Sequence, residues 1–364
     1  MSASQLAQMK ATLSAQEQIP TYTAPGPAIA NIASLRGDKV MVIPVSSQIT
    51  TCEQQANVEA VIGPLLGMKV TVFNNSGDPS QWSEGIEDAV NGGYKAIIIE
   101  CGIDPTAIAP QLTAAKKAGI VVVDQNVNDA SVSQVSPLIT AETTAWEDLQ
   151  QQYNVMQAFI ESGGKPMDAL VITSDENVPA PGMVQAIQSE YSKLCGSACK
   201  VEVEDVSIPD WSTKVQPTVS AALLADPKIT AIFCIYGGMI NGAIPAVESA
   251  HRSGVHIYTF GGGNDQLKLE EGSNIVLSNF GPSGVWAGYL AYYQALLGLT
   301  HQKVLPPADA ATPDRDFTPA TANQIFTPDG GMGTAFLNGY RQLFGLPPLS
   351  GQALIAAASY DDSL

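Results

Sequence analysis

From Lys39 onward, short apolar runs alternate with longer segments of helical character. The runs are rich in Val and Ile, which is typical of strands buried on both faces of a parallel sheet. Strands are predicted at 40–45, 69–73, 96–99 and 120–123, and a second series at 169–172, 201–206, 229–235, 256–260 and 275–277. Helices are predicted between them, including one at about 143–162 before the second series. Strand–helix alternation favours parallel sheets with helices on both faces, and right-handed crossovers make each series a doubly wound α/β lobe.

Composition excludes several classes of function. The net charge of −18 disfavours nucleic acid as a partner, because little here could neutralise phosphates. With 45% hydrophobic residues, the 364-residue chain has ample apolar material for two cores, yet no stretch approaches the length of a membrane span. The three histidines, at 251, 256 and 301, lie near no nucleophile elbow, and no phosphate-binding glycine loop is present. We therefore expect no catalysis, no metal and no cofactor.

Cysteine spacing bears on the compartment. Cys195 and Cys199 lie in Cys-Gly-Ser-Ala-Cys, where a local disulfide is favoured over two free thiols and would indicate an oxidising compartment. Cys234 is interpreted as a buried strand residue. The first residues show no basic segment followed by an apolar one, so either the chain is cytoplasmic or its numbering begins at a mature form. The cysteine pattern favours the second alternative.

Three segments carry a family resemblance. They are 104–123 (DPTAIAPQLTAAKKAGIVVV), 241–250 (NGAIPAVESA) and 259–265 (TFGGGND). In order and spacing they resemble the ribose-binding group of periplasmic solute-binding proteins, which in turn resembles the effector domains of lactose-repressor-type regulators. The resemblance runs from about Lys39 to Leu299 and implies a type I periplasmic binding fold. A repressor would need a helix-turn-helix before residue 40, where neither basic charge nor a recognition-helix pattern is found.

The resemblance also implies the domain organisation. Two lobes would be joined by a hinge of three chain crossings, near 139–142, 279–282 and 303–307. Lobe 1 would comprise 36–140 plus 281–304, and lobe 2 would comprise 141–280 plus 305–364, with a C-terminal extension. Residues 1–35 would be an N-terminal extension, in which Leu6, Met9 and Leu13 could line one face of a short helix.

Ligand contacts carry over position by position. The implied ligand-binding residues are Ser46, Gln48, Cys52, Asn126, Met183, Trp211, Tyr236 and Asn279. Asn126 stands where sugar binders carry Asp, Met183 where they carry Arg, and Gly261 where they carry a second Asp. Carboxylate and guanidinium groups, which can each hydrogen-bond two hydroxyls at once, are missing at these positions. We therefore expect a neutral, partly apolar site.

Five of these residues also have a structural alternative. Trp211 could cover a core edge, Tyr236 could hydrogen-bond locally, and Asn126 could serve a turn. Asn279 could serve the hinge, and Met183 could simply fill the core. Asp78 is predicted to cap the helix that follows it. Cys52 and Cys101 both fall at cleft-facing ends of the first lobe, so a disulfide between them is a further hypothesis.

The resemblance implies a solute-binding protein of an ABC importer. It would capture a small neutral ligand, such as a sugar, polyol or related compound, in an interlobe cleft, and then engage a membrane permease and its ATPase. Two alternatives stay open: a sensory protein that signals to a receptor, and a binder of a less polar, even aromatic, solute. We expect a monomer in the periplasm or anchored at the cell surface.

Overall fold

The computed structural model describes residues 1–131, 135–326 and 331–359. The chain divides into two compact units, each built on its own sheet. Unit 1 comprises Met1–Ile19, Trp146–Gly281 and Asp314–Ile325, and unit 2 comprises Pro20–Ala145, Pro282–Pro313 and Phe326–Leu364. Both units are α/β with parallel strand pairs, which confirms the predicted fold class.

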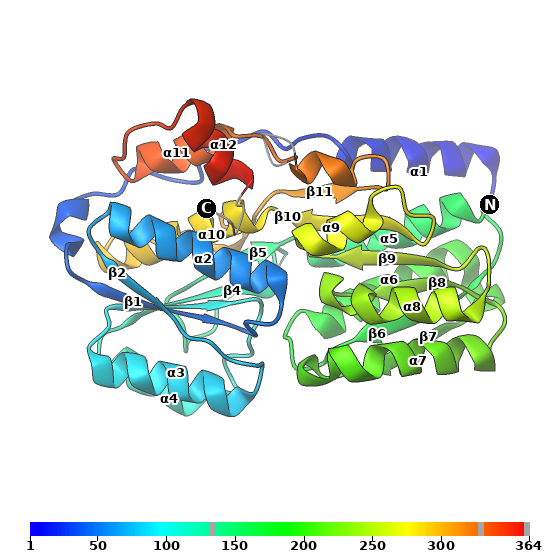
Figure 1. The fold of residues 1–364 in the computed structure, drawn as a ribbon, viewed down its shortest axis with the longest axis horizontal. Coiled ribbons are helices and arrows are strands. Elements are labelled where there is room, and N and C mark those ends of the chain that lie inside the picture. Colours follow the sequence, from blue (N-terminus) through cyan, green and yellow to red (C-terminus); the bar gives the residue numbers. More distant parts are fainter. Residues whose placement is uncertain (132–134, 327–330, 360–364) are drawn as a thin grey trace. The chain divides into compact units, whose positions relative to one another are not determined.

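Unit 2 contains a five-stranded sheet in the order β2-β1-β3-β4-β5. Its strands are β1 (Lys39–Pro44), β2 (Lys69–Val72), β3 (Ala96–Glu100), β4 (Val121–Asp129) and β5 (Ala141–Ala145). Its helices are α2 (Thr50–Leu65), α3 (Pro79–Gly92), α4 (Ala109–Lys117), α10 (Gly284–Leu299), α11 (Ala335–Leu343) and α12 (Gly351–Ser359). Helices α2 and α10 cover one face of the sheet, and α3 and α4 cover the other (Figure 1).

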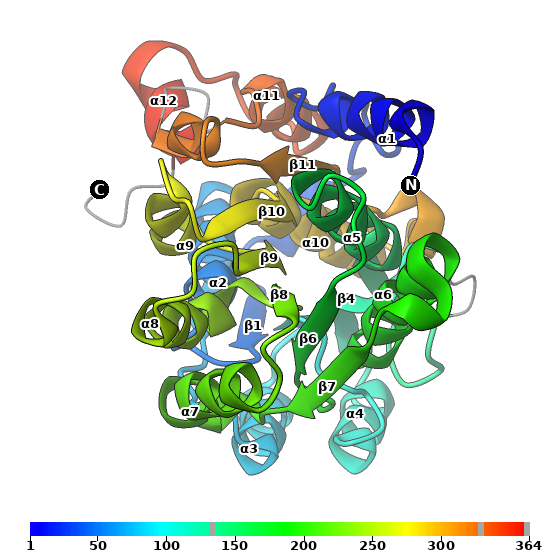
Figure 2. The same cartoon turned by 90° about the vertical axis from the view of Figure 1, so that its right-hand side faces the viewer.

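Unit 1 contains a six-stranded sheet in the order β11-β10-β9-β8-β6-β7. Its strands are β6 (Asp168–Thr173), β7 (Val201–Asp205), β8 (Ile229–Cys234), β9 (His256–Phe260), β10 (Val276–Pro282) and β11 (Asp314–Phe317). Its helices are α1 (Ala3–Gln16), α5 (Glu147–Glu161), α6 (Ala180–Cys195), α7 (Trp211–Ala225), α8 (Ile240–Ala250) and α9 (Asn264–Glu270). Helices α7 and α8 pack together, as do α5 and α6 (Figure 2).

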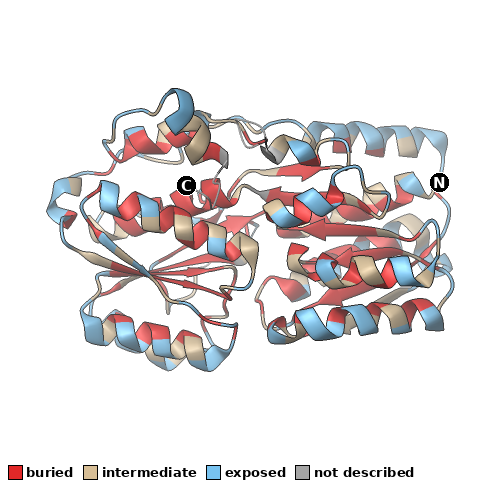
Figure 3. Ribbon diagram, viewed as in Figure 1, coloured by how far each residue is buried: buried red, intermediate tan, exposed pale blue. Residues whose placement is uncertain are grey.

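The cores follow the apolar runs of the sequence. In Figure 3 the central strands of both sheets are buried, and the surrounding helices alternate between buried and exposed residues. The predicted cap is confirmed, since the Asp78 carboxylate accepts a 2.8 Å hydrogen bond from the Ser80 amide at the start of α3. Helix α10 is exceptional, because nearly all of it is buried. A helix that is apolar on every side is covered on every side.

The C-terminal extension supplies part of that cover. Aromatic side chains of α10 and α11, joined by Tyr22 of the N-terminal arm, form one cluster with ring centroids from 4.5 to 6.5 Å apart. Its members, here called the aromatic cluster, are Tyr22, Trp286, Tyr289, Tyr293, Phe336, Tyr340 and Phe344. The extension is therefore part of the core of unit 2.

The two units are bounded differently from the predicted lobes. The chain passes between the units at 19/20, 145/146, 281/282, 313/314 and 325/326, where three crossings were predicted. Residues 1–35 are not a separate extension, because α1 buries Met9 and Leu13 and packs on α5 within unit 1. The tail was assigned to lobe 2 with residues 141–280, yet α11 packs on α10 in unit 2. Two strands were also missed, since β5 lies where a helix was predicted to begin, and β11 was not predicted at all.

Candidate functional site

Polar and aromatic residues follow the carboxyl ends of the strands in each unit. In open parallel sheets these ends are where ligands bind. In unit 1, Trp211 follows β7, Tyr236 follows β8, and Asn279 lies in β10. In unit 2, Ser46 and Gln48 follow β1, and Asn126 lies towards the end of β4. The sheet of unit 1 thus gathers three of the predicted ligand residues at one edge.

Trp211 is held firmly at the start of α7. Its side chain is 9% exposed, and its Nε1–H group donates to Ser174 Oγ at 2.7 Å and to the Val206 carbonyl at 3.1 Å. The indole stacks on Tyr236 with ring centroids 6.1 Å apart and an interplanar angle of 22°. A Cβ on Gly238 would lie only 2.9 Å from the indole, so glycine is what lets this backbone approach. Trp211 and Tyr236 therefore form a rigid aromatic pair.

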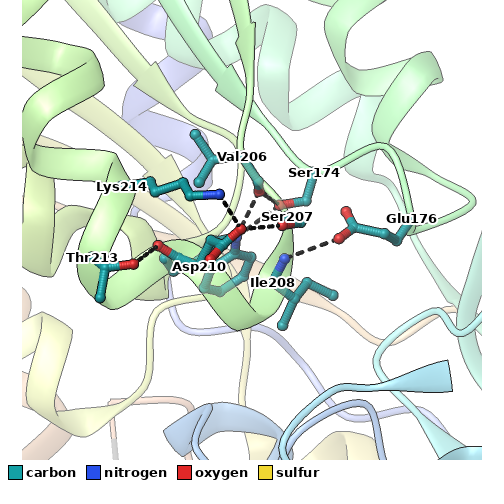
Figure 4. Close-up of polar contacts among 9 residues, drawn as sticks. Ser174, Glu176, Val206, Ser207, Ile208, Asp210, Thr213 and Lys214 are labelled. Carbon is teal, nitrogen blue, oxygen red and sulfur yellow. Dashed lines mark hydrogen bonds and ion pairs between the residues drawn. The ribbon is translucent and has the colours of Figure 1, made fainter. Parts of the chain in front are cut away.

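The loop before α7 is braced by charged and polar contacts (Figure 4). The Asp210 carboxylate accepts hydrogen bonds from Ser207 Oγ at 2.9 Å and from Lys214 Nζ at 2.6 Å. Hydrogen bonds from Lys214 and then Ser207 lower the pKa of Asp210, which keeps the carboxylate ionised. Glu176 accepts a 3.0 Å bond from the Ile208 amide. These contacts fix the loop that delivers Trp211 to its position.

Tyr236 lies in an acidic environment. Burial raises the pKa of its hydroxyl well above the ordinary value, the nearby Glu147 carboxylate adds to the shift, and the neighbouring Asn177 side chain opposes it. A hydroxyl held protonated beside Asn177 can donate and accept hydrogen bonds. Asn177, only 4% exposed, was not predicted.

Asn279 presents an amide at the end of the sheet. Its side chain is 2% exposed, and its Oδ1 accepts a 3.2 Å bond from the Gly262 amide. Its Nδ2 group, although buried, has no hydrogen-bond partner within the described part of the chain. A Cβ at Gly262 would clash with that nitrogen, so the amide can occupy its position only because residue 262 is glycine. Gly261 has a φ of 68° and brings no carboxylate here.

Asn126 offers the corresponding group in unit 2. Its backbone is left-handed, with a φ of 57°, a conformation that asparagine tolerates better than most residues. The side chain is 8% exposed, and its Oδ1 has no hydrogen-bond partner among the described residues. Gln125, which was not predicted, is fully buried and is likewise unpartnered through both side-chain polar atoms. Amides shortly after the apolar run 120–123 were the available signal for both residues.

The remaining predicted residues make structural contacts or are buried in the core. Ser46 is buried, and its Oγ accepts a 3.2 Å bond from the exposed Gln48, which is a turn contact. Met183 is fully buried in α6, which favours the core role left open for it. Cys52 forms a disulfide with Cys101, so it offers no free thiol to a ligand. The predicted Cys195–Cys199 disulfide is also present, and Cys234 is a buried free thiol, as interpreted from the sequence.

Several carboxyl groups are buried in unit 2. Burial raises the pKa of Glu59 and Glu100 well above the ordinary range, and their mutual repulsion raises that of Glu59 further. Burial also raises the pKa of Asp124, to which the Glu142 carboxylate contributes. Groups held neutral in this way add hydrogen-bonding capacity without charge. Within the ranges that the structure describes, no group of three or more His, Cys, Asp or Glu is arranged to hold a metal ion.

The fold of this chain is similar to that of several solved structures. A sugar ABC transporter protein from Yersinia enterocolitica aligns with a TM-score of 0.72 at 18% identity, covering 89% of this chain and 98% of its own. A solute-binding protein from Agrobacterium vitis with bound allitol aligns at 0.69 and 19% identity, covering 80% and 99%. A 5-methylthioribose transporter solute-binding protein from Thermotoga lettingae aligns at 0.67 and 16% identity, covering 89% and 97%. At such identities these likenesses establish the fold.

The family follows from the sequence match. Residues 40–303 match the family model described as periplasmic binding protein domain. Within the described residues, no helix combines the length and apolar character needed to cross a membrane. The family implies an extracytoplasmic protein. The chain belongs to the periplasmic binding protein domain family, and it binds a solute rather than catalysing a reaction.

Proposed function

We propose that this chain is the solute-binding component of an ABC importer and takes a small neutral ligand with several hydroxyl groups. The observation that carries the ligand class is that each unit has a buried amide with an atom that has no partner among the described residues, Asn126 Oδ1 in unit 2 and Asn279 Nδ2 in unit 1. Buried polar groups are normally satisfied, so an acceptor and a donor left open at strand ends call for a ligand hydroxyl. Neither amide carries charge, which favours a neutral ligand.

The aromatic pair supports the same class. Trp211 and Tyr236 form a fixed stack, and the Trp211 N–H group is already bonded within unit 1. A flat apolar ring face suits the C–H face of a sugar or polyol, whereas its edge remains engaged in the protein. The structural relatives include proteins with bound allitol, glycerol and L-rhamnose.

A less polar ligand is the second candidate. The site lacks the family carboxylates at Asn126 and Gly261, and the same aromatic pair would suit an apolar substituent. One relative is a 5-methylthioribose transporter protein, whose ligand carries both hydroxyls and a methylthio group. In either case the partners would be a membrane permease and an ATPase, and the protein would act in the periplasm or anchored at the cell surface.

A thermal-shift screen with L-rhamnose, allitol, glycerol and 5-methylthioribose tests the proposal. A ligand present at 100 times its Kd stabilises the folded protein by about 2.7 kcal/mol, which gives a readily measured rise in Tm. The Asn126→Ala variant should lose the rise, and the exposed Asn91→Ala variant should keep it. If none of the four compounds shifts the Tm, or if Asn126→Ala responds like the unaltered protein, the proposed ligand class is wrong.

A further inference from the structure

The Cys52–Cys101 disulfide joins two elements next to the candidate site in unit 2. Cys52 lies in the first turn of α2, and Cys101 directly follows β3. Their Cα atoms are 6.1 Å apart, within the usual range for a disulfide, and 49 positions separate them in sequence. Cys52 is 3% exposed, so its end of the disulfide is buried within unit 2.

Cys101 adopts an uncommon backbone conformation. Its φ is 66°, in the left-handed region where residues other than glycine are uncommon and where Asn, Asp and His are enriched among them. Cysteine has no side-chain amide or carboxylate that would favour this region locally. Such a conformation persists when the surrounding structure imposes it. The covalent bond to α2 is one constraint on this position, and it acts directly on Cys101.

The left-handed turn at Cys101 leads directly to the next strand end. Gly102 follows with a φ of 77°, and its amide donates a 2.8 Å hydrogen bond to the Gln125 carbonyl. Asn126 is the next residue, itself left-handed and with its Oδ1 unpartnered among the described residues. On the other side, the Glu100 carbonyl accepts a 3.1 Å bond from the Val45 amide. The turn is thus tied to the ends of β1 and β4.

We propose that the Cys52–Cys101 disulfide positions Asn126 for ligand binding by holding the Cys101–Gly102 turn in its left-handed conformation. The disulfide acts through the Gly102–Gln125 hydrogen bond and does not touch the ligand. Cys52 and Cys101 are therefore positioning residues, which replaces the expectation that Cys52 contacts the ligand. This inference rests on the proposed function only in taking Asn126 as a ligand contact.

Amide hydrogen exchange tests the coupling without any ligand. In the Cys52→Ser/Cys101→Ser variant we expect exchange at Gly102 and across 121–126 to quicken about tenfold or more, because the turn loses its constraint. The amides of β2 should be unchanged, which separates a local effect from loss of the fold. The Cys195→Ser/Cys199→Ser variant is the matched control, since it removes the other disulfide in unit 1. Unchanged exchange at Gly102 and 121–126 would overturn the proposal.

A second variant separates positioning from general stabilisation. Cys52→Ser/Cys101→Gly also lacks the disulfide, but glycine adopts a left-handed φ at little cost. We expect it to have a higher Tm than Cys52→Ser/Cys101→Ser and to recover part of the protection at Gly102. If the two variants have equal Tm and equal exchange, the strained turn is not what the disulfide holds, and the proposal fails.

Binding of L-rhamnose, measured by calorimetry, adds the functional readout. If the unaltered protein binds it, the serine variant should bind at least about tenfold more weakly, and the glycine variant should fall between the two. Equal affinity in all three proteins would contradict the positioning role. If the unaltered protein does not bind L-rhamnose, that result counts against this ligand, and the exchange experiment alone decides on the disulfide.

Discussion

The carboxyl group of Glu59 on α2 faces that of Glu100 at the end of β3, and both side chains are 0% exposed. Two carboxyl groups buried this close together repel each other when both are ionised, which favours a state in which at least one of them carries a proton. Around the pair lie Gln55 and the Cys52–Cys101 disulfide, and Tyr292 approaches from α10, its own pKa raised by burial and by Glu59. Within the described residues, no cationic side chain offsets the charge of either carboxyl group.

The Glu59–Glu100 pair predicts that the protein loses stability as pH rises. Both folded-state pKa values are raised above those of the unfolded chain, so the folded state binds protons more tightly. The stabilising contribution is complete below the unfolded value, about 4.3, and is lost as pH rises through the folded values. Urea unfolding of unaltered protein should therefore give a lower midpoint at pH 8 than at pH 5.

The Glu59→Gln variant should reduce that pH dependence, because it keeps a hydrogen-bonding group and removes one ionisable group. Glu53→Gln, at an exposed position on the same helix, is the control and should leave it unchanged. Equal midpoints at the two pH values in unaltered protein would refute the prediction, and so would an undiminished slope in Glu59→Gln.

Asp316 should likewise make the stability of unit 1 depend on pH. It accepts a 2.8 Å bond from Ser278, but burial raises its pKa to about 8. Glu270 faces it and is itself buried with a raised pKa, while Glu17 raises the pKa of Asp316 and Arg315 lowers it. Asp316→Asn should lessen the fall in urea midpoint between pH 5 and pH 8, and the exposed Asp309→Asn should not. A variant that falls as steeply as the unaltered protein would disprove it.

Trp211 should matter for stability as well as for binding. Because it is 9% exposed and hydrogen-bonded to Ser174, Trp211→Ala should lower the free energy of unfolding by about 3 kcal/mol, the range for large buried aromatic residues. Trp211→Phe keeps a ring against Tyr236 and should lose about 1 kcal/mol through the missing hydrogen bond. Trp146→Ala, at a residue 41% exposed, serves as the control in urea unfolding. Similar losses for Trp211→Ala and Trp146→Ala would speak against a fixed aromatic pair.

Phe336 should be among the costliest single truncations in the tail. It is 1% exposed and stacks on Trp286 with centroids 4.5 Å apart. Phe336→Ala should reduce the free energy of unfolding by about 3–5 kcal/mol, as for other buried Phe residues. Leu224→Ala, at a residue 88% exposed, should change it little. Denaturant titration of both variants checks this, and a loss below about 1 kcal/mol in Phe336→Ala would show that the tail is dispensable.

The sequence predicted the strands that carry a run or a regular alternation of apolar residues, including β7 (Val-Glu-Val-Glu-Asp), and failed where strands lack both patterns. β5 reads Ala-Glu-Thr-Thr-Ala, and every residue in it is buried, yet nothing local distinguishes it from the start of a helix. β11 reads Asp-Arg-Asp-Phe. Its Arg315 is buried, and the guanidinium donates a hydrogen bond to the carbonyl of Glu17, which is distant in sequence. Such strands depend on long-range partners, which local periodicity does not contain.

The same limit applies to the candidate site. The positions of Trp211, Tyr236 and Asn279 followed from strand ends and the family resemblance. What could not be predicted is which atoms of these side chains are already engaged. The Trp211 N–H group is taken by Ser174, 37 positions away, whereas the Asn279 amide keeps its nitrogen unpartnered in the described structure. Gly238 and Gly262 matter for a steric reason that only the assembled unit reveals.

The aromatic cluster has a consequence for biosynthesis. Helix α10 presents Trp286, Tyr289 and Tyr293 to rings that come from α11, near the end of the chain. During translation, the sheet of unit 2 and α10 emerge before residues 335–343 exist to cover them. Unit 2 therefore cannot complete its core until residues 335–344 have been made, long after the strands of its sheet.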